Sequence, residues 1–66
     1  MYNKHKVKKF LDDNFPPYQK YKVLSERNRR LTILLDYGKN ENSLQIEIMM
    51  SPDSKNLYRL VSTEFK

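Results

Sequence analysis

Two strands and a tight turn are encoded in residues 20–36, KYKVLSERNRRLTILLD. Apolar and polar side chains alternate on both sides of the centre of this stretch, and a period of two is typical of a half-buried strand. Asn28 at the centre is the residue best able to adopt the positive φ of a tight turn. The pattern therefore predicts antiparallel strands at residues 20–26 and 30–37, joined by a turn at residues 27–29.

A third strand is predicted for residues 44–50, in which Leu44, Ile46 and Ile48 occupy every second position. The connection before it, residues 38–43, is polar and contains the only glycine, as is typical of a hairpin loop. Because both connections are too short for a parallel crossover, the three strands should form an antiparallel meander. One face of this sheet would then carry the apolar side chains of Val23, Leu31, Ile33, Leu35, Leu44, Ile46 and Ile48.

An amphipathic helix is predicted before the strands, at residues 4–14. Val7, Phe10 and Leu11 recur at the spacing of one helical face. Asn3 can cap the first turn, and a Pro-Pro pair ends the helix because proline disfavours the helical conformation of the residue before it. Since the apolar face of the helix can cover the apolar face of the sheet, the sequence predicts a single α+β domain. Its fold would be one N-terminal helix packed on a three- or four-stranded antiparallel meander.

Two interpretations are open for the end of the chain. Ser51, Pro52 and Asp53 have the order of a helix start, and a C-terminal helix would give an α-β-β-β-α order. The aromatic and β-branched residues of 57–65 instead favour a strand. We favour a fourth strand at about residues 57–65, after a loop at residues 51–56.

The helix-first order, above all with a C-terminal helix, resembles that of double-stranded-RNA-binding domains and of small toxin-like ribonucleases. The chain lacks the basic start of a C-terminal helix that would support the first family. It also lacks the histidine after the first strand that would support the second. The resemblance is therefore one of topology alone, which says little about function.

The length and composition of the chain exclude several classes of protein. Sixty-six residues are too few for a second domain, and no stretch approaches the ~18 to 20 apolar residues that cross a bilayer. The absence of cysteine excludes disulfides and thiolate metal sites, and together with the lack of a signal peptide it predicts a cytoplasmic protein. A chain this short buries only ~60% of the surface that its unfolded form exposes, so its net stability is small. Association with a second copy would add stability, so a homodimer is an alternative to the monomer.

No residue pattern predicts catalysis or a cofactor. His5 is the only histidine, and without cysteine it cannot complete a zinc site, which needs at least three ligands. A single glycine cannot build a phosphate-binding loop. Asp12 and Asp13 are expected to pair with Lys8 and Lys9, one helical turn earlier. We therefore predict a protein that is not an enzyme and that binds no metal or cofactor.

Basic residues gather in the first half of the chain. Residues 1–30 hold nine Lys and Arg against three Asp and Glu, whereas residues 31–66 hold four against five. Arginine and lysine bind phosphate and tyrosine stacks on bases, so such a cluster predicts a surface for nucleic acid. The candidate site comprises the arginines of the turn, the residues that precede it and two helix lysines: Arg27, Arg29, Arg30, Lys20, Lys22, Tyr18, Tyr21, Lys4 and Lys8.

The favoured function is that of a small protein that binds nucleic acid through the phosphates, without catalysis. As an alternative, the same basic surface or a sheet edge would dock on an acidic protein surface, as in a phage or mobile-element factor that inhibits or modulates a host or defence protein. A third hypothesis is a small ribonuclease that depends on His5. No membrane role is expected, because the apolar face of the helix is needed for the core.

Overall fold

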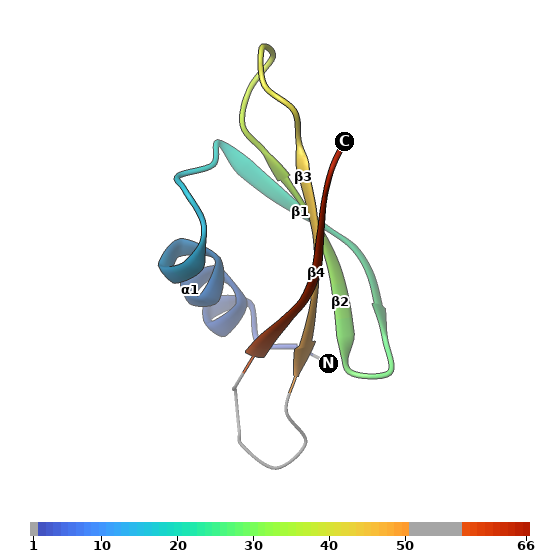
Figure 1. Ribbon diagram of the computed structural model, residues 1–66. Coiled ribbons are helices and arrows are strands. Elements are labelled where there is room, and N and C mark those ends of the chain that lie inside the picture. The colour runs from blue at the N-terminus through green and yellow to red at the C-terminus, as the bar shows by residue number, and fades with distance from the viewer. Residues whose placement is uncertain (1, 51–57) are drawn as a thin grey trace.

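A four-stranded antiparallel sheet carries one helix on one of its sides. The computed structural model describes residues 2–50 and 58–66. The elements follow the chain in the order α1 (Lys4–Asn14), β1 (Lys20–Arg27), β2 (Arg30–Asp36), β3 (Leu44–Met50) and β4 (Tyr58–Phe65), as Figure 1 shows. Each strand pairs with the next one, so the sheet order is β1-β2-β3-β4. The predicted α+β meander is confirmed, and so are the bounds of its elements to within one residue.

The end of the chain is a strand. Tyr58–Phe65 pairs with β3 along its whole length, so the alternative with a C-terminal helix is wrong. The chain therefore lacks the C-terminal helix that would have strengthened the topological resemblance. The physical reason is that aromatic and β-branched side chains fit a pleated surface better than a helix. The predicted loop at residues 51–56 lies outside the described residues.

Local hydrogen bonds define both ends of α1. The Asn3 Oδ1 accepts the backbone amide of Lys6 at 3.1 Å, which confirms the predicted N-cap. At the other end, the Phe15 amide donates to the Leu11 carbonyl at 3.0 Å. Phe15 itself has extended backbone angles, so the helix ends at the residue before it.

The exposed side of α1 carries two ion pairs between successive turns. Lys8 and Asp12 approach to 3.1 Å, and Lys9 and Asp13 approach to 3.0 Å, as predicted. Exposed pairs at this spacing contribute little to stability, because solvent screens them. An isolated helix this short is also marginal in water, so α1 depends mainly on packing against the sheet.

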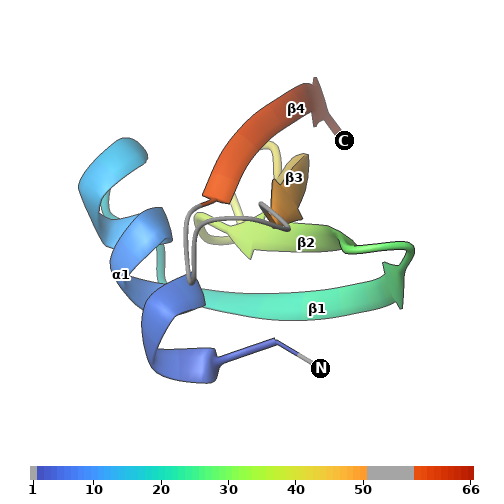
Figure 2. The same cartoon turned by 90° about the horizontal axis from the view of Figure 1, so that it is seen from below.

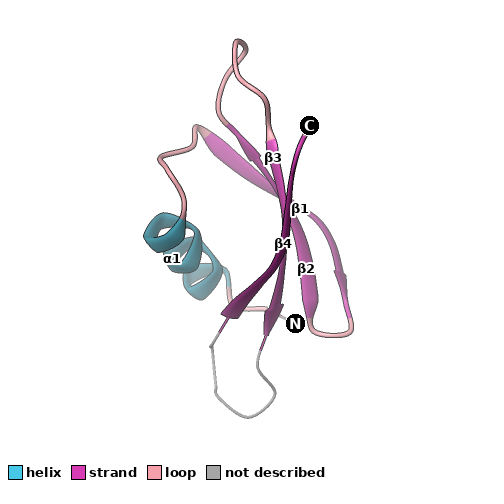
Figure 3. Cartoon of the chain, viewed as in Figure 1, coloured by secondary structure: helices cyan, strands magenta, loops and turns pink. Residues whose placement is uncertain are grey.

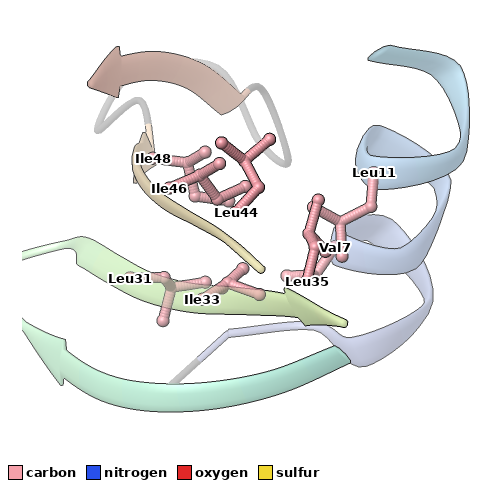
Figure 4. Packing of buried hydrophobic residues seen from close by; sticks show 8 residues of the cluster. All are labelled: Val7, Leu11, Leu31, Ile33, Leu35, Leu44, Ile46 and Ile48. Atoms are coloured by element: carbon pink, nitrogen blue, oxygen red, sulfur yellow. The ribbon is translucent and has the colours of Figure 1, made fainter. Parts of the chain in front are cut away.

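The core lies between α1 and the facing side of the sheet, as Figure 4 shows. Its buried members come from the helix and the two central strands: Val7, Leu11, Leu31, Ile33, Leu35, Leu44, Ile46 and Ile48. Figure 4 shows both helix residues pointing toward the sheet. Two further residues that were predicted to join this core, Phe10 and Val23, are only partly buried against it. Phe10 instead packs edge-to-face on Phe15 and Tyr58, with ring centroids 6.4 and 6.0 Å away.

A β-bulge in β1 changes which of its residues share a face. Val23 pairs with Ile33, but Ser25 pairs with Thr32, so Leu24 is an extra residue in this strand. Before the bulge, the even-numbered residues of β1 face away from α1. After the bulge the odd-numbered residues do so, and the last residue of the strand is among them.

The turn between β1 and β2 consists of Asn28 and Arg29, with φ of 52° and 63°. A positive φ at both positions is the geometry of hairpin turns whose twist matches that of the strands. The prediction for Asn28 is confirmed, and Arg29 adopts the same region, which is unfavourable for a residue with a Cβ. Figure 2 shows this hairpin projecting well beyond α1, in a molecule that measures 40 × 19 × 16 Å.

Candidate nucleic-acid interface

Figure 3 shows α1 on one side of the sheet, and we call the side that faces away from α1 the outer face. Most charged residues of the strands lie on this outer face. Leu31 and Ile33 are buried toward α1, so alternation along β2 turns Arg30 and Thr32 to the outer face. Cross-strand pairing extends this assignment to the other strands. Of the charged strand residues, only Glu26 lies on the α1 side of the sheet, where its cross-strand partner is Leu31.

Arginines from three strands lie in one line across the outer face. Arg27 pairs with Arg30, Arg30 with Met49, and Met49 with Arg59. We call these four residues the arginine row. Since neighbouring strands lie ~4.8 Å apart, the row spans about 14 Å across the sheet. The turn residue Arg29 lies beside one end of it.

These arginines differ in their partners. The Arg30 Nη1 lies 3.2 Å from the Glu47 Oε2, in an ion pair between partly exposed side chains. Arg59 donates to the Met49 Sδ at 3.7 Å, and a thioether is a weak acceptor. Arg27 and Arg29 form no ion pair with a carboxylate of residues 2–50 or 58–66. The described carboxylates therefore neutralise only part of the positive charge at this end of the molecule.

A polar hollow of about 610 Å³ opens beside the arginine row. It is lined by groups that donate or accept hydrogen bonds, together with one thioether: Ser25, Arg27, Asn28, Arg30, Thr32, Glu47 and Met49. Arginine, hydroxyl and side-chain amide groups are those that contact phosphate oxygens in nucleic-acid complexes. The bulge at Leu24 is what brings Ser25 and Arg27 to this side of β1.

Lys20 and Lys22 lie on the same face as the arginine row, farther along β1 from the turn. The Lys20 Nζ is 3.9 Å from Asp36, its cross-strand partner, and the lysine side chain is 79% exposed. Lys22 pairs with Leu34 and is also exposed. An exposed ion pair of this kind is weak, so both lysines can still attract an anionic partner. The structure thus places five of the predicted site residues on one face and its tip.

Tyr18 and Tyr21 lie on the other side of the sheet, against α1. The Tyr18 hydroxyl donates to Asp12 at 2.8 Å, and the two tyrosine rings meet edge-to-face at 5.9 Å. Lys8 pairs with Asp12 and places its Nζ 5.7 Å from the centre of the Tyr18 ring. The hydrogen bonds from Tyr18 and Lys8 hold the pKa of Asp12 below its ordinary value. These three residues therefore fasten the helix to β1 and are not brought to the arginine row, and neither is the exposed Lys4 on α1.

None of the eight aromatic side chains lies on the outer face. Seven pack against the core on the α1 side: Tyr2, Phe10, Phe15, Tyr18, Tyr21, Tyr37 and Tyr58. The eighth, Phe65, pairs with the buried Leu44 and shares its face. Because all eight belong to the described residues, the outer face offers no ring on which a base could stack.

Sequence reasoning missed two charged members of this surface, Arg59 and Glu47. Both come from strands that are distant in sequence from the hairpin, and only the pairing of β3 and β4 brings them beside it. Period two along residues 44–50 did place Glu47 on the polar face of β3. The neighbours of Glu47 depend on the register between strands, and the alternation within one strand does not predict that register.

The described residues include no group of three or more His, Cys, Asp or Glu placed to hold a metal ion. Within the same ranges, no helix has the length and apolar character needed to span a membrane. Comparison with protein-family models, with curated proteins and with solved structures finds no match for this chain. A function can therefore be inferred only from the geometry of the surface itself.

Proposed function

We propose that this protein binds duplex DNA through its outer face, without catalysis, with the arginine row and the adjoining turn on the phosphates. The observation that carries the proposal is the gathering of Arg27, Arg29, Arg30 and Arg59 at one end of the sheet. Glu47 is the one carboxylate that forms an ion pair with any of them among the described residues. Like charges held together repel one another, and an anionic partner relieves that repulsion.

The groups around the row suit phosphate oxygens. A guanidinium presents a planar fork of donors that matches two oxygens of a phosphate. Ser25 and Thr32 add hydroxyl groups in the adjoining hollow, and Lys20 and Lys22 extend the positive surface along β1. Contacts of this kind fix a protein on a nucleic acid and carry little sequence information, so we expect weak sequence preference.

Two features of the fold favour a duplex over a single strand. Proteins that bind single strands stack bases on aromatic rings, and here every ring lies on the α1 side or is turned toward it. The projecting β1–β2 hairpin is a two-stranded ribbon, which the major groove of B-form DNA, ~12 Å wide, can admit. The major groove of A-form RNA is too narrow for side chains to read, so DNA is the better fit.

The decisive experiment compares two double variants in fluorescence anisotropy with a labelled DNA duplex at low salt. Arg27→Glu with Arg29→Glu reverses two charges that form no ion pair with described carboxylates. We expect its affinity for the duplex to fall about a hundredfold, as for two lost charge-assisted contacts. Lys6→Glu with Lys39→Glu is the matched control: it changes the net charge equally, at exposed positions on α1 and in the β2–β3 loop, and should retain most of the affinity.

Each other outcome has a distinct meaning. If the native chain binds no duplex at low salt, the proposal is wrong, and a stoichiometric protein partner captured from a nuclease-treated extract would support the acidic-protein alternative. If single-stranded DNA or duplex RNA of the same length binds as tightly, the preference for duplex DNA is wrong. If both double variants weaken binding equally, net charge and not the arginine row explains the affinity.

A further inference from the structure

We propose that two copies of this chain pair through β4 to form a dimer with one continuous sheet. Among the described strands β4 has only β3 as a neighbour, and every residue from Arg59 to Phe65 is exposed. This strand also carries three exposed large apolar side chains, with 43% of Leu60, 40% of Val61 and 72% of Phe65 accessible. A long, exposed edge strand with apolar side chains is a template for pairing with another chain. The occupant that fits it best is a second β4.

The backbone of β4 presents hydrogen-bonding groups along its open edge. The Lys66 amide donates to the Ser43 carbonyl, on the β3 side, at 2.8 Å. Successive residues of an antiparallel ladder turn their N–H and C=O groups alternately to one side and the other. Phe65 and Thr63 therefore turn theirs away from β3, toward the open edge.

A bulge in the middle of β4 shifts this alternation by one residue. Adjacent residues of β3 pair with Ser62 and Leu60, so Val61 is extra. Past the bulge, Leu60 and Tyr58 are the residues that turn their backbone groups toward the open edge. Their side chains lie on the α1 side of the sheet, as do those of the edge-facing residues before the bulge.

This pattern makes β4 complementary to itself. When two identical antiparallel strands pair about a two-fold axis, residues that lie opposite each other must meet two conditions. Their side chains must lie on the same face of the sheet, and their N–H and C=O groups must both turn toward the partner strand or both turn away from it. The register that sets Leu60 opposite Thr63 of the second copy also sets Tyr58 opposite Phe65 of the second copy. All four residues share the α1 side and the open edge. Without the extra residue Val61, each of these pairs would join side chains on opposite faces.

Charge supports the same register. The register sets Arg59 opposite Glu64 of the second copy on the outer face, and the two-fold axis repeats this contact. Opposite charges directly across an antiparallel pair are stabilising, whereas like charges are destabilising. Within one copy the two residues lie near opposite ends of β4, where Glu64 pairs with the exposed Lys66 at 3.4 Å and Arg59 donates to the Met49 sulfur.

The register also covers the most exposed of the large apolar side chains in the described residues. Phe65 of one copy would lie across from Tyr58 and diagonally from Leu60 of the other, within reach of an aromatic ring. The two-fold axis stands perpendicular to the sheet, so both helices lie on one side and both outer faces on the other. A dimer therefore leaves Arg27, Arg29 and Arg30 exposed and engages only Arg59 of the arginine row. The inference does not depend on the proposed function.

Sedimentation of the full-length chain over a range of concentrations, without nucleic acid, tests this proposal. The native chain should dimerise as its concentration rises. Arg59→Glu and Glu64→Arg each place like charges at both repeated contacts, and each should raise the dimer dissociation constant about tenfold. Lys39→Glu, a reversal in the β2–β3 loop, is the control and should leave that constant unchanged.

Mixing the two single variants gives the sharpest readout. A dimer of one Arg59→Glu copy and one Glu64→Arg copy has opposite charges at both contacts, so the mixture should dimerise although each variant alone does so poorly. Such recovery requires a contact between copies. A native chain that stays monomeric at every concentration, or a mixture that shows no recovery, would overturn the inference. Neither result would bear on DNA binding, which the anisotropy experiment measures separately.

Discussion

The two faces of the sheet are built from the same strands but hold different kinds of side chain. The face toward α1 collects the buried aliphatic residues and, with the helix, all eight aromatic rings. The outer face collects nearly all the charged strand residues and no ring. Neighbouring residues of a strand point to opposite faces. Residues that pack in the core therefore alternate along each strand with residues that are available for the proposed binding. Substitutions on one face should therefore change stability, and substitutions on the other should change affinity.

The largest expected effect compares neighbouring leucines on the two faces. Leu35→Ala removes a fully buried side chain and should lower the free energy of unfolding by ~2–5 kcal/mol. A chain of this size has only a few kcal/mol of net stability, so this variant should be largely unfolded. Leu34→Ala, on the partly exposed outer face, should cost no more than about 1 kcal/mol. Urea unfolding followed by circular dichroism measures both, and equal losses would mean that the outer face is also a core.

The next comparison tests affinity on the two faces. Binding to about five phosphates predicts that log K falls with log[salt] at a slope near −4 to −5. Arg27→Ala should weaken binding to every duplex sequence and make the slope shallower by about 1. Lys8→Ala, which removes an equal charge on the α1 side, should leave the affinity and the salt slope unchanged. Anisotropy titrations at several salt concentrations measure these slopes, and a Lys8 effect as large as that of Arg27 would place the binding surface elsewhere.

The arrangement of elements follows from local patterns in the sequence. Spacing on the helical face and period two in the strands place α1 and the first three strands, because these signals depend only on neighbouring residues. The fourth strand is favoured over a helix only by its aromatic and β-branched residues. The face occupied by Arg27 does not follow from period two. The extra residue Leu24 reverses the alternation, and nothing in residues 20–27 marks where a bulge will occur.

The composition of the candidate site was predictable only in part. The hairpin arginines and the β1 lysines could be grouped from the sequence because they lie within one hairpin, on β1, its turn and the first residue of β2. The tyrosines could not be placed correctly relative to them. Tyr18 is drawn to α1 by its hydrogen bond with Asp12, a tertiary contact that no local pattern records. Arg59 joins the arginine row only through the register between β3 and β4.

A smaller effect separates stability from binding within the turn. Arg29 has a φ of 63°, which is unfavourable for a residue with a Cβ but not for glycine. Arg29→Gly should therefore raise the free energy of unfolding by about 0.5–1 kcal/mol while it weakens DNA binding. Asn28→Gly is the control, since asparagine already tolerates this conformation, and it should change stability less. Arg29→Gly would contradict the proposed role of the turn if it gained stability and lost no affinity.

The smallest effect concerns the contact that fastens α1 to β1. The hydrogen bonds from Tyr18 and Lys8 lower the pKa of Asp12, so the ionised carboxylate is favoured in the folded state. The resulting stability is present above the ordinary aspartate pKa of about 3.9 and is lost as the pH falls through the lowered pKa. Tyr18→Phe should therefore raise the pKa of Asp12 toward its ordinary value. It should reduce stability at neutral pH, and the difference from the native chain should shrink under acid conditions.

An NMR titration of the Asp12 carboxyl, together with unfolding at several pH values, measures this effect. Tyr21→Phe is the matched control, because the Tyr21 hydroxyl forms no hydrogen bond with the described residues. Tyr21→Phe should leave the pKa of Asp12 unchanged. DNA affinity should be the same in both variants, because both rings lie on the α1 side of the sheet. A loss of affinity in Tyr18→Phe alone would show that the side of the molecule assigned to folding also takes part in binding.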